Sequence, residues 1–353
     1  MEKDRIQRIG RLPNEVERVS HLTSRILLGR FGPLIIAVIL LLTLPPFVPM
    51  DIRLMMAKFL IFAIFAMGFN LVFGYLGLLS LGHGVYFGAG GYTVALLQYH
   101  LHIDSFWIAM PLAILVPVVL AALLGPIVLR STGMYFLLLT FAIGELFYSI
   151  SWQARFMSVI GVGGERGVRG IPSVIYPDLN IPGLALDTTS FYYFILVGFV
   201  ICYILLYRIT NSPFGHALVG IREGEPRMQA LGFNTWRYKY IALIISAAFS
   251  GVAGAMFAWH NTIIDPSHFA VGTSFLPMVM SIIGGSKVLF GPVIGAVIVI
   301  FVEYFASIHM RLRWPLILGS IFVVAVMFAR AGVGVYLERL WKKVGVRYGN
   351  TKS

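Results

Sequence analysis

Apolar stretches of about 20 residues recur along most of this chain, and they limit its fold more than any other feature. A run of that length and composition crosses a lipid bilayer as an α-helix. The strands of a transmembrane barrel would instead alternate apolar and polar residues over about 10 positions, and these runs do not alternate. Only 12% of the 353 residues are charged. The sequence therefore predicts an all-α fold, a polytopic membrane helix bundle.

We expect about 8 to 10 transmembrane helices, with a broken or re-entrant segment among them. The membrane domain is expected over residues 31–330, between a basic N-terminal tail, 1–30, and a C-terminal tail, 331–353. The third, eighth and tenth predicted spans are short or rich in glycine, so they are the candidates for tilted, broken or re-entrant segments. In chain order the predicted spans are Phe31–Pro49, Leu54–Phe73, Gly84–Tyr99, Phe106–Leu129, Tyr135–Trp152, Phe191–Tyr207, Tyr240–Trp259, Phe269–Ile283, Val288–Tyr304 and Trp314–Ala329.

The positions of the basic residues predict the orientation in the membrane. If both termini lie in the cytoplasm, the inner side holds 20 of the 27 Lys and Arg residues and the outer side holds 7. Cytoplasmic loops carry such an excess. This orientation puts loop 208–239 inside and loop 153–190 outside. The clustering of charge at span ends also argues against a nucleic acid partner, despite the net charge of +12.

The sequence lacks the motifs of catalysis and of metal binding. The single cysteine, Cys202, excludes an intrachain disulfide and a metal site built on cysteine. No His-Glu-x-x-His or Gly-x-Ser-x-Gly motif occurs, and no P-loop occurs either, because the dipeptide Gly-Lys is absent. We therefore expect no catalytic residue, no metal ligand and no cofactor bound by this chain, which would not hydrolyse ATP by itself.

The segment between Arg208 and Lys239 is a long polar connection between two apolar spans. Most connections are a handful of residues, and longer ones are usually functional. This one carries Arg208, Arg222, Arg227, Arg237 and Lys239. We interpret it as a cytoplasmic docking element, through which another protein drives this one. The outer stretch 153–190, which contains GVGGERGVRGIP, is expected to be irregular. It is either a solvated loop or a surface that receives a partner or lines the pore entrance.

The stretch Asn70–Tyr92, NLVFGYLGLLSLGHGVYFGAGGY, is the most unusual one within the predicted membrane region. Small residues allow helices to pack closely, but seven glycines exceed that need, so we favour a broken helix of the kind that transporters place at substrate sites. The candidate break glycines are Gly74, Gly77, Gly82 and Gly84. His83 fits a hydrogen-bonded structural residue better than a ligand.

Polar groups inside apolar spans are costly and are candidates for function. Two acids, Glu145 and Glu303, lie within such spans. The alternative is that both lie near a membrane surface, which their side chains reach. Two isolated acids make proton-coupled transport the weaker hypothesis. The candidate residues of a translocation path are Asn70, Ser80, His83 and Glu145, although the Asn70–Gly91 region could instead be purely architectural.

Several motifs together resemble the branched-chain amino acid ABC transporter permeases of the LivM/LivH type, with LivM the closer match. These are the Asn70–Tyr92 stretch, FAIGE, GGERGVRGIP, SPFGHALVGIREGEPRMQALGFNTWRYKYIALIISAAFSGVAGAMFA and IIGGSKVLFGPVIGA. They cover most of residues 55–300 in the order of the family. Residues before Leu54 and after Arg330 match less well.

The resemblance implies a multi-pass subunit of a bacterial inner-membrane importer that works by alternating access. It implies a second permease subunit, two ATP-binding cassette subunits that hold ATP and Mg²⁺, and an extracytoplasmic substrate-binding protein as partners, with lipid around the chain. The piece GIREGEPRMQALG is similar to the coupling helix of ABC permeases, in which Pro226 is a departure. The residues that would contact the ATPase are Gly220, Arg222, Glu223, Glu225, Ala230, Leu231 and Gly232.

Other functions remain open at this level. The same architecture could import urea, short amides or aromatic acids, because a permease receives cargo that the binding protein has already selected. A stand-alone channel or secondary transporter would belong to a different class, and uptake by this chain alone without nucleotide would favour it. A membrane enzyme is disfavoured by the missing catalytic set.

Overall fold

In a computed structural model of the chain, the structure describes residues 41–103, 105–153, 167–169, 188–309, 316, 319, 320, 323, 327 and 332–334. The chain divides into two compact units. The smaller comprises Met1–Val48 and Leu337–Ser353, and its described part contains the 3-10 turn η1 (Pro45–Phe47). The larger, Pro49–Tyr336, holds all other elements. The tail boundaries predicted at residues 30 and 331, and most of the first and tenth predicted spans, lie outside the described residues.

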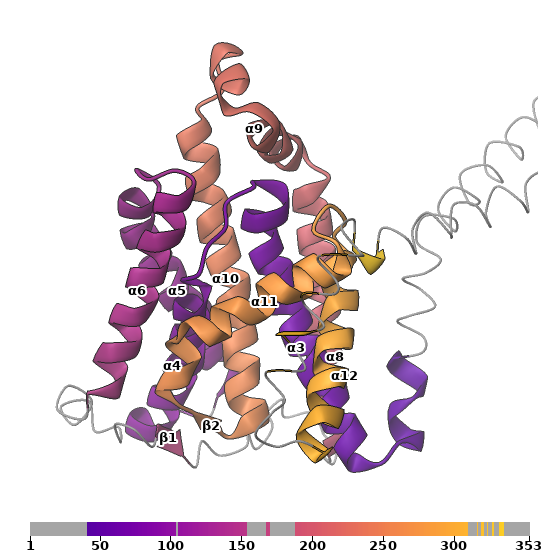
Figure 1. Cartoon of the computed structure of the whole chain (residues 1–353). Coiled ribbons are helices and arrows are strands. Elements are labelled where there is room, and N and C mark those ends of the chain that lie inside the picture. Colours follow the sequence, from indigo (N-terminus) through magenta and orange to yellow (C-terminus); the bar gives the residue numbers. More distant parts are fainter. Residues whose placement is uncertain are drawn as a thin grey trace, which may run out of the picture. The chain divides into compact units, whose positions relative to one another are not determined.

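The larger unit is built almost entirely of helices in the part that the structure describes (Figure 1). This confirms the predicted all-α membrane bundle, and each predicted span from Leu54–Phe73 to Val288–Tyr304 falls on a helix. The helices are α3 (Met50–Asn70) with the π-helical turn η2 (Leu71–Tyr75), α4 (His83–Leu101), α5 (Phe106–Val128), α6 (Met134–Trp152), α8 (Thr188–Thr210), α9 (Pro213–Ala230), α10 (Thr235–Asn261), the 3-10 helix η4 (Pro266–Phe269), α11 (Val271–Gly284) and α12 (Gly291–His309).

Among the described residues, six helices are long and apolar enough to cross a membrane: α3 with η2, α5, α6, α8, α10 and α12. The other two predicted spans differ for identifiable reasons. Helix α4 is long enough but rich in glycine. Helix α11 has 14 residues, whereas a span needs about 20. These are the third and eighth predicted spans, which the sequence marks as short or glycine-rich.

The helices divide into a buried centre and an exposed rim. Helix α10 packs against α3, α4 and α5, and α3 also packs against α8, α11 and α12. Most of α3 and α10 is buried, whereas α5, α6 and α8 leave most of their length exposed. Their outer faces carry large apolar side chains such as Leu123, Leu138 and Val197, each more than half exposed. Since water would oppose such a surface, we assign it to lipid.

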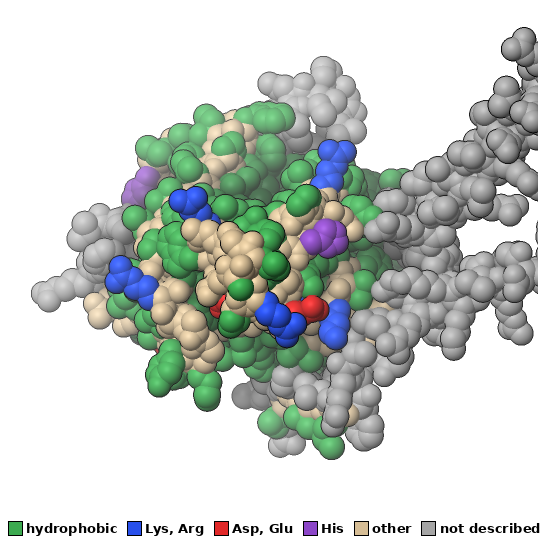
Figure 2. All heavy atoms as spheres, turned by 90° about the horizontal axis from the view of Figure 1, so that it is seen from above, with side chains coloured by type: hydrophobic (Ala, Val, Ile, Leu, Met, Phe, Trp, Pro, Cys, Tyr) green, Lys and Arg blue, Asp and Glu red, His purple; other side chains and the backbone are tan. Residues whose placement is uncertain are grey.

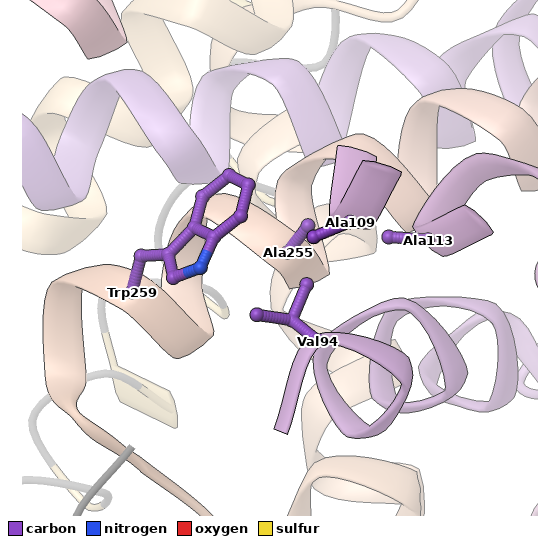
Figure 3. Packing of buried hydrophobic residues seen from close by; sticks show 5 residues of the cluster. All are labelled: Val94, Ala109, Ala113, Ala255 and Trp259. Atoms are coloured by element: carbon purple, nitrogen blue, oxygen red, sulfur yellow. The ribbon is translucent and has the colours of Figure 1, made fainter. Parts of the chain in front are cut away.

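Small residues bring α4, α5 and α10 close together. Figure 3 shows Val94 of α4, Ala109 and Ala113 of α5, and Ala255 and Trp259 of α10 packed into one buried cluster. Next to Ala255, a side chain at Gly254 would collide with the carbonyl oxygen of Phe87 on α4. Backbones that approach this closely gain van der Waals contact without help from water. The GVAG segment of α10 (Gly251–Gly254) is therefore a packing surface.

A two-residue strand pair lies after α10. Strand β1 (Val168–Arg169) pairs antiparallel with β2 (Ile263–Ile264), with Val168 opposite Ile264. The rest of the predicted outer loop, from 154 to 166 and from 170 to 187, lies outside the described residues. After β2, Asp265 and His268 form a capping box that starts η4, and the chain then enters α11.

Candidate functional site

The chain between α3 and α4 forms the predicted break. After the π-helical turn, residues Leu76–Gly82 are not helical, although Ser80 and Gly82 are buried. Two backbone N–H groups of this non-helical stretch donate to side-chain hydroxyl oxygens. Leu81 N–H donates to Thr140 Oγ1 (3.1 Å) and Gly82 N–H donates to Ser80 Oγ (3.3 Å). Non-helical backbone persists in a membrane only where protein satisfies it in this way.

The first turns of α4 and α11 meet at this break. Gly84 N–H, in the first turn of α4, donates to Ser274 Oγ in the first turn of α11 (2.7 Å), and both groups are buried. A side chain at Gly84 would lie 3.0 Å from that oxygen and 3.1 Å from the Ala270 carbonyl oxygen. The two helices that differ from ordinary spans therefore begin side by side inside the protein.

Asn70 is the last residue of α3, and its side chain forms a hydrogen bond to the other side of the bundle. Its Nδ2 donates to the Ser286 carbonyl oxygen (3.0 Å), in the turn between α11 and α12. Its Oδ1 is buried without a hydrogen-bond partner among the described residues. A side chain at Gly74 would collide with this oxygen and with Ser286. Asn70 thus fixes the α11–α12 turn to the start of the break.

His83 is the first residue of α4 and is completely buried. Its Nε2 lies 2.9 Å from Ser246 Oγ, and Ser246 donates its only hydroxyl proton to the Gly68 carbonyl oxygen (2.7 Å). His83 Nε2 must then be the donor in its bond with Ser246. Its Nδ1 is buried without a partner among the described residues. These contacts join α4 to α10 and α3.

Glu145 lies apart from these three predicted path residues. It is half-buried on α6, with no hydrogen bond or ion pair to any residue that the structure describes. Its neighbour Gly144 faces the break, because a side chain there would lie 3.5 Å from the Leu81 carbonyl oxygen. Asn70, Ser80 and His83 are connected through the break, and Glu145 borders it. Their role in transport stays a prediction.

Helix α9 occupies most of the predicted docking segment and has two arms. Ser212 caps its start by accepting from Gly215 N–H (3.4 Å), and Gly224, with φ −179° and ψ 86°, interrupts the helix. Pro226 follows the kink by two residues, in the first turn of the second arm, where a missing N–H costs nothing. The helix therefore begins at Pro213, earlier than the piece that resembles a coupling helix.

Arg222, in the first arm, reaches inward to the break. Its Nη1 donates to the Gly74 carbonyl oxygen, and only 26% of its side chain is exposed. Gly77 lies under the Arg222 methylenes with φ +80°, a conformation that favours glycine, and a side chain there would lie 2.6 Å from Arg222 Cγ. The sequence assigns Arg222 to ATPase contact; the structure joins it to the end of α3.

The second arm is fixed to α10 by Glu225. Glu225 Oε1 lies 2.5 Å from Lys239 Nζ and accepts from Thr235 Oγ1 (2.9 Å). The Lys239 side chain is only 9% exposed. An ion pair this shielded, with a further hydrogen bond, holds its geometry better than a pair on the open surface. Helix α9 is therefore bonded to both the Gly74 turn after α3 and the start of α10.

Of the other predicted docking residues, four are exposed on α9 or at its end, whereas Gly220 is half-buried, and a side chain there would lie 2.8 Å from Met228 Sδ. Glu223, Ala230, Leu231 and Gly232 are exposed, and Leu231 has 72% of its surface exposed. Gly232, with φ +87°, ends the helix, and the N–H groups of Gly232 and Phe233 donate to the carbonyl oxygens of Gln229 and Met228. The result is an apolar knob on a short rigid arm.

Basic side chains surround this knob. Figure 2 looks onto the face that carries α9 and shows Lys and Arg side chains spread among hydrophobic ones, with few acidic groups between them. The exposed basic residues at this end of the described helices are Arg130, Arg208, Arg227, Arg237 and Lys287.

Sequence reasoning missed the acceptors that satisfy the break, namely Thr140, Ser246 and Ser274. Each is a buried hydroxyl residue within an apolar span. Polar groups at such positions are costly unless they bond, so their placement was the available signal. Their partners could not be read from the sequence, because they are far away in the chain.

A family model described as "Branched-chain amino acid transport system / permease component" matches residues 52–331. The LivM permease protein of the high-affinity branched-chain amino acid transport system of Salmonella typhimurium is 30% identical over 260 residues, which cover 68% of this chain. The match spans 60% of that relative's length.

Two further relatives are named for different cargo. The probable LivM permease protein of Methanocaldococcus jannaschii is 22% identical, over 73% of this chain and 82% of its own length. The guanosine ABC transporter permease protein NupQ of Bacillus subtilis is 25% identical, over 34% of this chain and 40% of its own length. No solved structure matches the chain.

Proposed function

Because this chain belongs to the family of permease components of branched-chain amino acid transport systems, we propose that it is a permease subunit of an ATP-driven ABC importer for branched-chain or related amino acids. It would pair with a second permease subunit, two ATP-binding cassette subunits that hold ATP and Mg²⁺, and an extracytoplasmic binding protein. The observation that carries the proposal is the pair of connections from α9 to the bundle, through Arg222 to Gly74 and through Glu225 to Lys239.

These connections suit alternating access. The exposed Leu231 tip would seat in a groove of the ATPase, and closure of the ATPase pair would displace α9. Arg222 and Glu225 then pass that displacement to the ends of α3 and α10, the two most buried helices. Packed helices switch between discrete arrangements more readily than they deform. ATP supplies the bias, because the two arrangements differ in affinity for it.

The charge distribution supports the proposed orientation. At the end that carries α9, the described residues include Arg130, Arg208, Arg237 and Lys287, all exposed. Loops rich in Lys and Arg stay on the cytoplasmic side of a bilayer. We therefore place α9 and both termini in the cytoplasm, in the inner membrane of a bacterium.

The test is co-purification followed by reconstitution. The chain, expressed with its neighbouring subunits, should copurify with an ATP-hydrolysing protein. Proteoliposomes containing that assembly and the loaded binding protein should take up leucine only when ATP is present on the side of the bilayer that carries the ATPase. Uptake by this chain alone without nucleotide would establish a channel or secondary transporter instead. Uptake of guanosine, urea, short amides or aromatic acids in place of leucine would retain the mechanism and change the cargo.

A further inference from the structure

A cavity of about 300 Å³ lies between α3 and α12, at the end of the bundle away from α9. Its wall includes the ion pair of Lys58 and Glu303, the apolar side chains of Leu54 and Ile300, and His260 from the last turn of α10. The cavity lies away from α9 because it is lined by the first half of α3, whereas η2, which follows the other end of α3, contacts α9. A volume of this size is at the lower end of the range for small-molecule sites.

The ion pair is difficult to explain as a structural contact alone. Lys58 Nζ lies 2.8 Å from Glu303 Oε1, with 29% and 22% of the two side chains exposed. A partly exposed pair contributes little net stability, because desolvation and side-chain ordering offset much of its attraction. Ionisable groups inside membrane-spanning helices usually mark a path for substrate or ions. Both residues line this cavity.

We propose that this cavity binds the zwitterionic head group of an α-amino acid, with Lys58 taking the carboxylate and Glu303 taking the ammonium group. This rests on the proposed function and adds the site that recognises the cargo. The ligand would exchange with the ion pair and replace each partner of that pair by a group of the same charge. Leu54 and Ile300 would then contact an aliphatic side chain.

Charge balance makes this exchange selective. Lys58 and Glu303 are the half-buried charges of the cavity, whose lining also includes the exposed Asp51, and a zwitterion leaves both half-buried charges paired. A carboxylic acid without the amine would leave Glu303 unpaired, and an amine without the carboxylate would leave Lys58 unpaired. A site built to pair a polar group rejects an analogue that lacks it. A neutral nucleoside compensates neither charge.

His260 provides a third polar group at the cavity. Its Nδ1 is buried and has no hydrogen-bond partner among the described residues, while its ring stacks on Phe191 at 6.3 Å with an interplanar angle of 5°. A ligand group that reached this buried nitrogen would give it the hydrogen bond that it lacks.

The experiment measures equilibrium binding to the purified transporter assembly, with three radiolabelled probes: L-leucine, 4-methylpentanoate and 3-methylbutylamine. The wild-type protein should bind leucine at least about tenfold more tightly than either half-ligand. Glu303→Gln should weaken leucine binding by about tenfold or more and make it equal to that of 4-methylpentanoate. Lys58→Met should lower the affinity for leucine to that for 3-methylbutylamine. Asp265→Asn, at the same end but outside the cavity, is the control and should keep wild-type affinities.

A double variant, Lys58→Met with Glu303→Met, keeps the test valid if the single variants do not fold, because an apolar pair removes both charges together. It should remain monodisperse and lose leucine binding. Wild-type leucine affinity in this double variant, or in both single variants, would overturn the proposed site. If the wild-type assembly transports leucine while the double variant does so equally well, only the site is wrong. If the wild-type assembly transports no amino acid, the proposed function itself fails.

Discussion

The bond between Arg222 and Gly74 makes the sharpest prediction about coupling. Arg222→Met keeps the methylenes that cover Gly77 but removes the guanidinium that binds the Gly74 carbonyl oxygen. The proposed ATPase contact at Leu231 is unchanged, so the ATPase should still bind. Transport should suffer, because the displacement of α9 no longer reaches α3 through this bond.

The magnitude follows from the bond lost. A hydrogen bond to a charged group contributes about 1.5–3 kcal/mol, and the Arg222 side chain is 26% exposed, so the lower value applies. About 1.5 kcal/mol corresponds to about a tenfold change in an equilibrium. We expect the number of leucine molecules imported per ATP hydrolysed to fall by about tenfold, with ATPase association unchanged.

The assay compares uptake and ATP hydrolysis in the same proteoliposomes. His216→Gln, an exposed change on the first arm of α9, is the matched control and should behave as wild type. Arg222→Ala also removes the methylenes and should perform no better than Arg222→Met. An unchanged ratio of uptake to hydrolysis in Arg222→Met would refute the connection between α9 and the break.

Three further predictions address docking, packing and pH. Leu231→Asp should abolish copurification of the ATPase in a pull-down without lowering the melting temperature, because Leu231 is 72% exposed; retention of the ATPase would exclude this tip as the contact. Gly254→Val should reduce the yield of folded protein in size-exclusion chromatography, since its side chain would collide with Phe87, whereas Gly272→Ala has no neighbour within 4 Å and should be tolerated. The hydrogen bond from His268, more than the bonds from Ser267, lowers the pKa of Asp265 from 3.8 to about 2, against the effect of burial. A lowered pKa stabilises the fold above the unfolded value and ceases to do so as the pH falls through the folded value, so the difference in melting temperature between wild type and Asp265→Asn should be present at pH 7 and shrink between pH 4 and pH 2.

The sequence predicts the helices well, because a membrane span needs only length and apolar composition. It also predicts the break in the right stretch, since glycines at the density of Asn70–Tyr92 oppose a continuous helix. It does not distinguish α3 and α10, which face protein, from α5, which faces lipid. The reason is physical: lipid and protein interior both favour apolar residues, so hydropathy is similar on either surface.

Long-range polar pairs are the other part that the sequence does not specify. Glu303 stands out as an acid inside an apolar span, but nothing local indicates that its partner is Lys58, 245 positions away in the chain. Arg222 resembles a docking residue because it lies in a basic segment, whereas its direction depends on how α9 folds back toward Gly74. Such pairs are decided by tertiary packing, and a single sequence contains no record of that packing.

Helix α3 connects the two ends of the proposed mechanism. Lys58 near one end and Gly74 near the other are about 24 Å apart along the chain at the helical rise of about 1.5 Å per residue. Most of the helix between them is buried, and a closely packed helix moves as a unit because its neighbours leave no room for bending. A displacement that Arg222 imposes at Gly74 would then shift Lys58 relative to Glu303 on α12. On the proposed mechanism, the same helix that receives the force from the ATPase therefore also opens or closes the ion pair that the cargo must replace.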